Sequence, residues 1–369
     1  MKQTRLNICH IINGFNAGGA QVFLSSLTKY QSLTNNVFIL SISKIDEISG
    51  FDYSLRKKIE SNNIYVIDLE RKPGKNFTFV KSLKIAKTFF KNNRIDIINT
   101  HLPLSHLFTS ILGLEIPIVN TIHNAPEKTS FLTKFLNRNS AKIYCSKSAL
   151  MLNNFKGKNT VINNGVEFNG TNFQNHQIDL IKDLNIPLGS KVVISVGALR
   201  KQKNYSFLMD LARKFPENSN IHFVVCGGFD KDLKLFESVK NNKLSNFHYI
   251  GTKLNINNYL SSADLFLSCS VHEGLPIAVL EAFITGIPVL LSPIEQHISI
   301  SEGVYKSYIP ADFKLESFKK SIISIIENNE THNSILNKRK DHITRFSIVD
   351  TSKQYLKFYK EITNKQIDI

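Results

Sequence analysis

Short apolar segments alternate with helix-like segments along this chain, and the alternation forms two successive series. The first series opens with an expected strand at 6–12 and an expected helix at 20–30. The second opens with a strand at 191–196, followed by a helix from Tyr205. Strands separated by helices pair in parallel and are covered by those helices, because a tight turn can join only antiparallel strands. The pattern predicts an α/β protein with two doubly wound, Rossmann-like domains.

The two series are separated at Asn164-Gly165-Val166, where the periodic pattern stops and a polar stretch continues to about Gln177. We therefore expect one domain at 1–172 and a second at 185–345. A chain of 369 residues is long enough for both domains to bury a core. Open parallel sheets bind ligands at the carboxyl ends of their strands, so two such domains facing each other would share a cleft.

The composition is that of a soluble globular enzyme, with 42% hydrophobic and 21% charged residues. Asn7, His10 and Asn13 interrupt the first apolar segment, which makes it a poor signal peptide and a good strand. No apolar run approaches the roughly eighteen residues of a membrane-spanning helix. The cysteines lack C-x-x-C spacing, which is typical of reduced thiols in a cytosolic protein: Cys9, Cys145, Cys226 and Cys269.

Two glutamates eight residues apart, Glu273 and Glu281, flank the start of an expected apolar helix. Gly274 permits a tight turn before it, and Pro276 suits its first position because no N–H is needed there. Side chains of a helix lean toward its N-terminus, so the Glu281 carboxylate is expected near Glu273. Both carboxylates would then lie beside free backbone N–H groups and the positive end of a helix dipole. Such a site suits a polyhydroxylated ligand that carries phosphate.

The run Glu273-Gly274-Leu275-Pro276, with Glu281-Ala282 after it, resembles the E-x7-E signature of the family-4 retaining glycosyltransferases. Further matches extend over essentially the whole chain, which looks like the bacterial surface-polysaccharide type of this family. The resemblance implies the GT-B fold, with a helix at 351–369 packing back on the first domain. It also implies retaining transfer of a sugar from a nucleotide diphosphate sugar, with a UDP-sugar favoured. The implied acceptor is a glycan or a lipid-linked glycan.

The resemblance also implies donor-binding roles in the second domain. Lys203 matches the lysine that neutralises the donor diphosphate, while Ala198 stands where the family has arginine. Arg200, two residues on, is a candidate replacement for that arginine. Gly227 and Gly251 end strands and are expected to approach the nucleotide.

The two glutamates receive different implied roles. Glu273 would orient the sugar hydroxyls at the reacting centre, and Glu281 would bind the ribose. The helix mouth formed by Gly274, Leu275 and Pro276 would stabilise the charge of the leaving diphosphate. Because both carboxylates are expected to face the cleft, replacing either with alanine should leave the fold intact.

In the first domain, the loop after the first strand contains Asn16 and the pair Gly18-Gly19. The glycine pair resembles the one that opens family-4 transferases and reaches the donor phosphate and the acceptor. His101 and His123 follow two later strands of this domain. His123 matches the histidine placed near the transferring sugar, whereas His101 and Asn16 are acceptor-side candidates. A single histidine at such a place is more often structural.

Asp230-Lys231-Asp232 spells D-x-D, the metal motif of the other large glycosyltransferase fold. Here it opens an expected helix, where aspartate is favoured by the dipole alone. We therefore expect no metal and no cofactor, with Lys203 and the helix mouth meeting the diphosphate charge instead.

The net charge of +16 is concentrated in the first part of the chain. Residues 1–170 contain 22 Lys and Arg against 10 Asp and Glu, a net of +12, and 71–94 contains eight basic residues and no acidic one. This segment reads as a basic amphipathic helix with Val80 on its apolar stripe. A solvated face, a nucleic-acid patch and an anionic lipid surface would each explain it. No nucleic-acid-binding motif accompanies it, so nucleic acid is the weakest of the three.

The lipid interpretation predicts peripheral contact with an anionic membrane through four lysines of this helix: Lys81, Lys84, Lys87 and Lys91. The protein would then be cytoplasmic and work at the inner face of the cytoplasmic membrane. Two alternatives to a transferase stay open. One is a sugar-nucleotide epimerase or phosphorylase of the same fold, and the other is a non-catalytic basic protein that binds lipid or nucleic acid.

Overall fold

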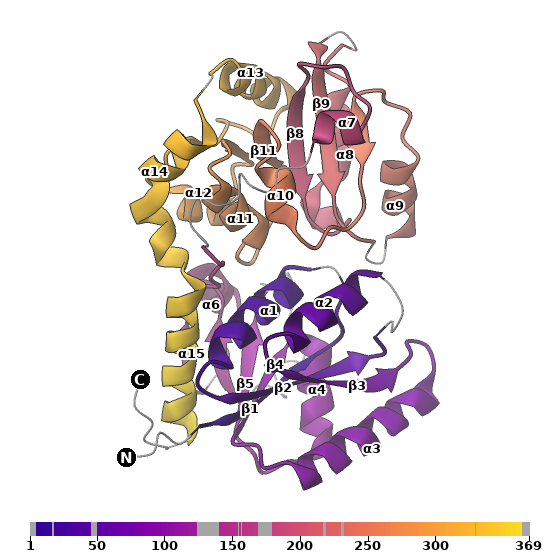
Figure 1. Ribbon diagram of the computed structural model, residues 1–369, viewed down its shortest axis with the longest axis vertical. Helices are drawn as coiled ribbons and strands as arrows, with labels where there is room; N and C mark the ends of the chain where they lie inside the picture. Colours follow the sequence, from indigo (N-terminus) through magenta and orange to yellow (C-terminus); the bar gives the residue numbers. More distant parts are fainter. Residues whose placement is uncertain are drawn as a thin grey trace. The chain divides into compact units, whose positions relative to one another are not determined.

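The computed structural model describes residues 5–16, 18–45, 50–123, 140–153, 155, 157–168, 179–216, 219–229, 232–328 and 330–363. The chain divides into two compact units (Figure 1). The first unit comprises Met1–Glu167 together with Phe346–Ile369, and the second comprises Phe168–Arg345. Each unit is built on a parallel sheet with helices on both faces, so the prediction of two doubly wound, Rossmann-like domains is confirmed.

The first unit contains a sheet of seven described strands in the order β3-β2-β1-β4-β5-β6-β7. The strands are β1 (Asn7–Ile12), β2 (Asn36–Ser43), β3 (Tyr65–Arg71), β4 (Ile97–His101), β5 (Ile118–Ile122), β6 (Ala141–Tyr144) and β7 (Asn159–Val161). The chain runs outward from β1 to β3 and then returns to the other side of β1 at β4. This reversal makes the edge between the carboxyl ends of β1 and β4 the expected ligand site of the unit.

Helices cover both faces of the first sheet. The described ones are α1 (Gly19–Gln31), α2 (Gly50–Glu60), α3 (Asn76–Asn92), α4 (Pro103–Leu112), α6 (Lys147–Asn153) and α15 (Ile348–Thr363). On one face α1 and α15 share a core in which Phe23 packs with Tyr355. On the other face α3 and α4 contribute Ala86 and Phe108 to a second core. The first unit is therefore completed by a helix that follows the second unit in the sequence (Figure 1).

The second unit contains a sheet of six described strands in the order β10-β9-β8-β11-β12-β13. The strands are β8 (Lys191–Val196), β9 (Ile221–Cys226), β10 (Phe247–Tyr249), β11 (Leu265–Ser268), β12 (Val289–Leu291) and β13 (Ser307–Tyr308). The strand order reverses between β8 and β11, so this unit also has a switch point at its centre.

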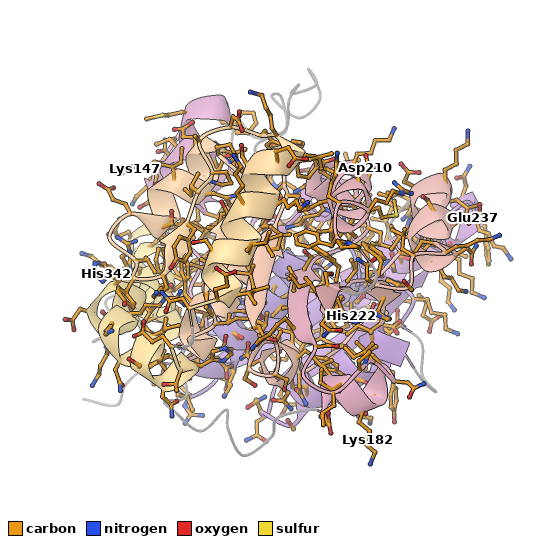
Figure 2. The ribbon with its side chains drawn as sticks, turned by 90° about the horizontal axis from the view of Figure 1, so that it is seen from above. Lys147, Lys182, Asp210, His222, Glu237 and His342 are labelled. Carbon is orange, nitrogen blue, oxygen red and sulfur yellow. The ribbon has the colours of Figure 1, made fainter. Side chains whose placement is uncertain are left out.

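The helices of the second unit again cover two faces. They are α7 (Leu180–Asp183), α8 (Tyr205–Ala212), α9 (Leu233–Lys240), α10 (Ile256–Leu260), α11 (Ile277–Thr285), α12 (Glu295–Ser301), α13 (Leu315–Ile326) and α14 (His332–Ile343). One core joins the sheet to α8, α9 and α13, with Leu208 and Phe318 at its centre. Figure 2 shows exposed side chains such as Lys182 and Glu237 on the outer helices α7 and α9. On α14 the buried Arg339 donates to the Ile287 carbonyl at 2.8 Å, which ties α14 to the end of α11.

The elements expected from the sequence agree with the structure to within a few residues, except for the start of the basic helix, but several described elements were not expected, among them α2, α4, β13 and α12 to α14. The sequence interpretation missed β3, whose last residue, Arg71, had been assigned to the basic segment. The basic helix begins only at Asn76, and Val80, expected on its apolar stripe, is 54% exposed. The polar stretch at 169–178 and the residue Asp230 lie outside the described residues. Among the described helices, none is long and apolar enough to cross a membrane.

Candidate functional site

The expected donor-binding residues of the second unit lie at the switch point between β8 and β11. The chain leaves β8 through Gly197 and forms a short 3-10 helix, η2 (Lys201–Lys203), which presents Lys203. It leaves β11 at Ser268 and passes through Glu273 to α11. Two loops that are distant in sequence therefore meet at the carboxyl edge of one sheet, because their strands are neighbours.

Lys203 and Glu273 form a buried ion pair at this edge. The Lys203 Nζ lies 2.6 Å from Glu273 Oε1, and the side chains are 17% and 6% exposed. Ser270 Oγ donates to the same oxygen at 2.6 Å, and Gln202 Nε2 donates to Oε2 at 3.3 Å. Burial acts to raise the pKa of the Glu273 carboxyl, but the charge and hydrogen bond of Lys203 and the Ser270 bond hold that pKa below its ordinary value. The carboxylate is thus ionised and fixed in orientation.

Glu273 was expected to face the cleft rather than the core, so that its replacement would leave the fold intact, but its side chain is only 6% exposed and holds the Lys203 ammonium. Its replacement by alanine would leave the Lys203 ammonium without its carboxylate in a desolvated site, which destabilises the folded protein. Glu281, by contrast, is partly exposed on α11.

Two glycines of the edge are required by close approach. Gly197 has φ +154°, and a Cβ there would lie 2.8 Å from Cε of Lys203. A Cβ on Gly227 would lie 1.8 Å from the Gly197 carbonyl oxygen. Gly227 N also donates to the Gly251 carbonyl at 2.9 Å, so the ends of β8, β9 and β10 converge on one glycine-lined edge. Side chains here would displace Lys203 or separate the strands.

The helix mouth expected from the sequence is present at α11. Gly274, Leu275 and Pro276 are buried, and Pro276 occupies the N-cap, one position before the first helical residue where it was expected. Glu281 lies near the end of β9: burial raises the pKa of the Cys226 thiol to about 12, and the Glu281 charge adds to that increase. Glu281 is therefore close to the strand end from which Gly227 follows.

Arg200 immediately precedes η2, and its carbonyl accepts from Lys203 N at 3.0 Å. The guanidinium is partly buried one turn from Lys203, so both cations belong to the same loop. Asp232 caps α9 by accepting from Leu235 N at 3.0 Å, which is the helix-terminal position expected for it.

His297 is a residue of this edge that the sequence interpretation missed. It lies on α12, is fully buried, and donates from Nδ1 to the Ser292 carbonyl at 3.1 Å. Burial lowers its pKa to about 4, while the nearby Glu273 carboxylate acts in the opposite direction. No motif or spacing in the sequence marks this histidine. It comes close to Glu273 only because the second sheet places α12 beside the loop that follows β11.

In the first unit, the loop after β1 leads into α1 beside the switch point. Asn16 and Gly19 are exposed, and Gly18 is the N-cap of α1 with extended backbone at φ −174°. A Cβ on Gly18 would lie 2.6 Å from Oε1 of Gln21, whose Nε2 donates to the Gly14 carbonyl at 3.2 Å. The N-terminus of α1 therefore presents backbone N–H groups and exposed small residues, a setting suited to an anion or a hydroxyl.

The expected histidines of the first unit form part of a buried series of three. His101 Nε2 lies 3.0 Å from His10 Nδ1, and His101 Nδ1 lies 3.0 Å from His123 Nε2. Burial lowers the pKa of each imidazole, to about 4 for His10 and His123. This geometry corrects the acceptor-side assignment of His101: it is fully buried and both ring nitrogens face other histidines, so no nitrogen remains for an acceptor.

His123 differs from the other two histidines at one atom. It follows β5 and is 8% exposed, and its Nδ1 has no hydrogen-bond partner among the residues that the structure describes. A buried ring nitrogen without a partner is costly unless a ligand or water completes it. His123 is thus the member of the series whose second ring nitrogen is left without a bond among the described residues.

The expected membrane-facing lysines, Lys81, Lys84, Lys87 and Lys91, are all exposed on α3. Lys81 pairs with Glu70 of β3. Phe77, on the first turn of the same helix, is 78% exposed. The exposed surface of α3 therefore combines cations with an uncovered aromatic side chain.

Comparison with known proteins finds a family match within the second unit. Residues 176–342 match the family described as glycosyl transferases group 1. A UDP-Gal:alpha-D-GlcNAc-diphosphoundecaprenol alpha-1,3-galactosyltransferase of Escherichia coli is 26% identical over 306 residues, covering 74% of this chain and 78% of the relative. The capsular polysaccharide biosynthesis glycosyltransferase CapH of Staphylococcus aureus is 26% identical over 364 residues, covering 92% and 93%.

Solved structures establish the fold of the whole chain. HepE of Anabaena, crystallised with UDP and glucose, has a TM-score of 0.76 at 16% identity and covers 97% of this chain and 100% of that chain. The sucrose-phosphate synthase of Thermosynechococcus elongatus has a TM-score of 0.78 at 16% identity and covers 98% and 100%. These structural neighbours are GT-B glycosyltransferases. The second unit is therefore similar to group 1 glycosyl transferases, the relatives are bacterial glycosyltransferases, and the fold of the chain is that of GT-B glycosyltransferases.

Proposed function

We propose that this enzyme transfers a sugar from a UDP-sugar to a glycan or lipid-linked glycan acceptor in surface polysaccharide biosynthesis. The transfer retains the anomeric configuration and requires no metal. Two named relatives support the substrate classes: one uses UDP-Gal and a diphosphoundecaprenol-linked sugar, and another acts in capsular polysaccharide biosynthesis.

The observation that supports this proposal best is the Lys203–Glu273 pair at the glycine-lined edge. A buried ammonium next to α11 provides two positive features, the cation and the helix N-terminus, for a diphosphate. A buried, ionised carboxylate provides an acceptor for sugar hydroxyls. The site therefore matches both halves of a nucleotide diphosphate sugar, with Glu281 assigned to the ribose and Arg200 to the phosphate charge that the family arginine meets.

In the proposed reaction, the bond from the anomeric carbon to the diphosphate oxygen breaks and the electron pair leaves with UDP. The acceptor hydroxyl oxygen attacks the same face of the sugar, and its proton passes to the leaving diphosphate oxygen. Lys203 and the α11 mouth stabilise the negative charge that develops on UDP. Glu273 holds hydroxyls of the sugar while its ring becomes positively charged.

The first unit is assigned to the acceptor side of the reaction. Asn16, Gly18 and Gly19 lie around the N-terminus of α1, where backbone N–H groups suit an anionic or hydroxylated group. His123 is assigned to a substrate hydroxyl through its unpartnered Nδ1.

The basic surface of α3 is assigned to peripheral contact with an anionic membrane, where a lipid-linked acceptor would be found. Exposed lysines and the exposed Phe77 are the features that such contact uses. The enzyme would then act at the inner face of the cytoplasmic membrane.

Product analysis tests the proposal. The protein is incubated with a panel of UDP-sugars, with and without a diphosphate-linked polyprenyl sugar acceptor and in the presence of EDTA. We expect UDP release that depends on acceptor and survives EDTA, and a product whose new linkage keeps the donor's anomeric configuration. A sugar nucleotide converted to its epimer without acceptor would indicate an epimerase. Consumption that depends on inorganic phosphate would indicate a phosphorylase.

A further inference from the structure

The histidine series of the first unit continues beyond His10 to an amide. His10 Nε2 lies 2.8 Å from the Gln31 side-chain oxygen, at the last residue of α1. Gln31 is fully buried, as are His10 and His101. Four side chains, from α1, β1, β4 and the residue after β5, therefore form one continuous hydrogen-bonded series that ends at His123.

The three imidazoles are neutral near pH 7, because burial lowers each pKa. A neutral imidazole has one nitrogen that donates and one that accepts. Fixing the proton of one ring in such a series therefore fixes the protons of all three.

The Gln31 oxygen sets the direction of the series, since a carbonyl oxygen can only accept. His10 must donate from Nε2, so its Nδ1 accepts from His101 Nε2. His101 Nδ1 then accepts from His123 Nε2, and His123 is left with a bare Nδ1. Within the described part of the chain, that atom has no hydrogen-bond partner.

We propose that Gln31, acting through His10 and His101, is a positioning residue that fixes the tautomer of His123 so that its Nδ1 accepts a hydrogen bond from a substrate hydroxyl. The substrate part of this statement rests on the proposed function, whereas the tautomer part does not. His123 would then bind a hydroxyl as an acceptor, and it cannot act as an N–H donor from Nδ1.

Tyr359 of α15 is the residue to compare when the orientation of the Gln31 side-chain amide is tested. Its buried hydroxyl and the Gln31 amide nitrogen both lack a hydrogen-bond partner among the described residues, and Gln31 is close enough to act on the pKa of that hydroxyl. If the amide were reversed, its oxygen would accept from Tyr359 and its nitrogen would donate to His10. Every bond of the series would then reverse, and His123 would present Nδ1–H.

The tautomers are measured without substrate on the full-length protein labelled with ¹⁵N-histidine. Two-bond ¹H–¹⁵N correlation spectra distinguish a protonated from a bare ring nitrogen, and the His123→Phe variant identifies the His123 signals. We expect one tautomer for His123, with the proton on Nε2 and Nδ1 bare. A proton on Nδ1, or averaged signals from both tautomers, would overturn the proposal.

Two nearly isosteric variants distinguish the role of Gln31 from that of Tyr359. Gln31→Met removes the fixed acceptor, and we expect a second set of His123 signals from the Nδ1–H form. Tyr359→Phe keeps the Gln31 oxygen, and we expect the wild-type spectrum. Unchanged His123 signals in Gln31→Met, or a switched tautomer in Tyr359→Phe, would contradict the direction assigned here. Backbone amide spectra verify that each variant is folded. If Gln31→Met does not fold, His10→Phe is measured in its place, because it interrupts the series at the next residue.

Kinetics connect the tautomer to the reaction. Loss of one oriented hydrogen bond in Gln31→Met should lower kcat roughly two- to tenfold and leave the KM for the donor nucleotide unchanged. An unchanged kcat with mixed tautomers would overturn the substrate contact of Nδ1. The expected tautomer in a protein that transfers no sugar would overturn the proposed function and leave the tautomer assignment standing.

Discussion

Lys203 and Glu273 are 70 positions apart in sequence, yet their charged atoms lie 2.6 Å apart at the boundary where the strand order of the second sheet reverses. Glu273 is buried and Lys203 is largely shielded from solvent. The same two side chains thus determine both the stability of this edge and its affinity for a charged ligand.

Removing one member of this pair should destabilise the protein. Lys203→Met leaves the Glu273 carboxylate buried without its cation, and we expect a loss of about 3–5 kcal/mol in the free energy of unfolding. The double variant Lys203→Met/Glu273→Gln should recover part of that loss, because neither charge remains. Urea unfolding of Lys203→Met, Glu273→Gln and the double variant gives the coupling free energy between the two side chains. Additive losses would mean that the ion pair contributes nothing.

Lys203 should discriminate between ligands with and without a diphosphate. Lys203→Ala is expected to weaken binding of UDP much more than binding of uridine, because only UDP carries the charge that Lys203 meets. Lys201, exposed on the same short helix, is the matched control, and Lys201→Ala should have little effect on either ligand. Calorimetry measures both affinities, and equal losses for UDP and uridine would exclude the phosphate role.

Glu281 should recognise the ribose. Glu281→Ala is expected to reduce UDP affinity by roughly 1.5–3 kcal/mol, the range for a hydrogen bond to a charged acceptor. The difference in affinity between the wild type and Glu281→Ala should be smaller for 2′-deoxy-UDP than for UDP. A variant that loses the same affinity for both nucleotides would place the Glu281 contact elsewhere on the ligand.

Stability should fall on acidification because of buried histidines. Burial lowers the pKa of His10, His123 and His297 to about 4, below the ordinary value near 6.5. Between these values the unfolded chain binds protons that the folded chain does not, so the free energy of unfolding decreases as the pH falls. Each histidine should contribute a loss of about 2 kcal/mol between pH 7.5 and pH 5.

Thermal unfolding across that range measures the effect. Above pH 7 these histidines should contribute no slope, since they are neutral in both states. His297→Gln should reduce the slope below pH 6.5, because one buried imidazole is gone. A stability that stays constant from pH 7.5 to pH 5 would contradict neutral burial of these rings.

Attachment to anionic vesicles should depend on α3. Replacing Lys81, Lys84, Lys87 and Lys91 with Gln should abolish binding to vesicles that contain anionic lipid, since each cation contributes about 1 kcal/mol near such a surface. Four exposed lysines of the second unit serve as the control set: Lys234, Lys240, Lys243 and Lys320. Sedimentation at low and high salt measures binding, which salt should weaken. A wild-type protein that ignores anionic vesicles at low salt would leave α3 as an ordinary solvated helix.

The sequence predicted most of the fold because its central strands are apolar and separated by regular helices. It did not reveal β3, which lies at an edge of the first sheet and contains Asp68 and Glu70 among its apolar residues. Edge strands are solvated on one side, so their apolar signal is weak. The exposure of Val80 was missed for a related reason. Helical periodicity identifies the apolar face of α3, but it does not show which residues of that face the sheet covers.

The candidate site was predicted only as separate residues. Motif spacing pointed to Lys203, Glu273 and Glu281, but no local pattern states that Lys203 and Glu273 pair. His10 was noted only as a polar interruption of the first strand, because its contact with His101 depends on how β1 and β4 are aligned. Contacts of this kind follow from strand register, which a single sequence leaves undetermined.

The placement of α15 has a consequence for biosynthesis. Tyr355 and Tyr359 fill the core beneath α1, yet the ribosome makes them only after the whole second unit. Until then the apolar side of α1, including Phe23 and Leu27, has no α15 to cover it. The core that α1 shares with α15 therefore cannot be completed until the chain beyond the second unit has been synthesised.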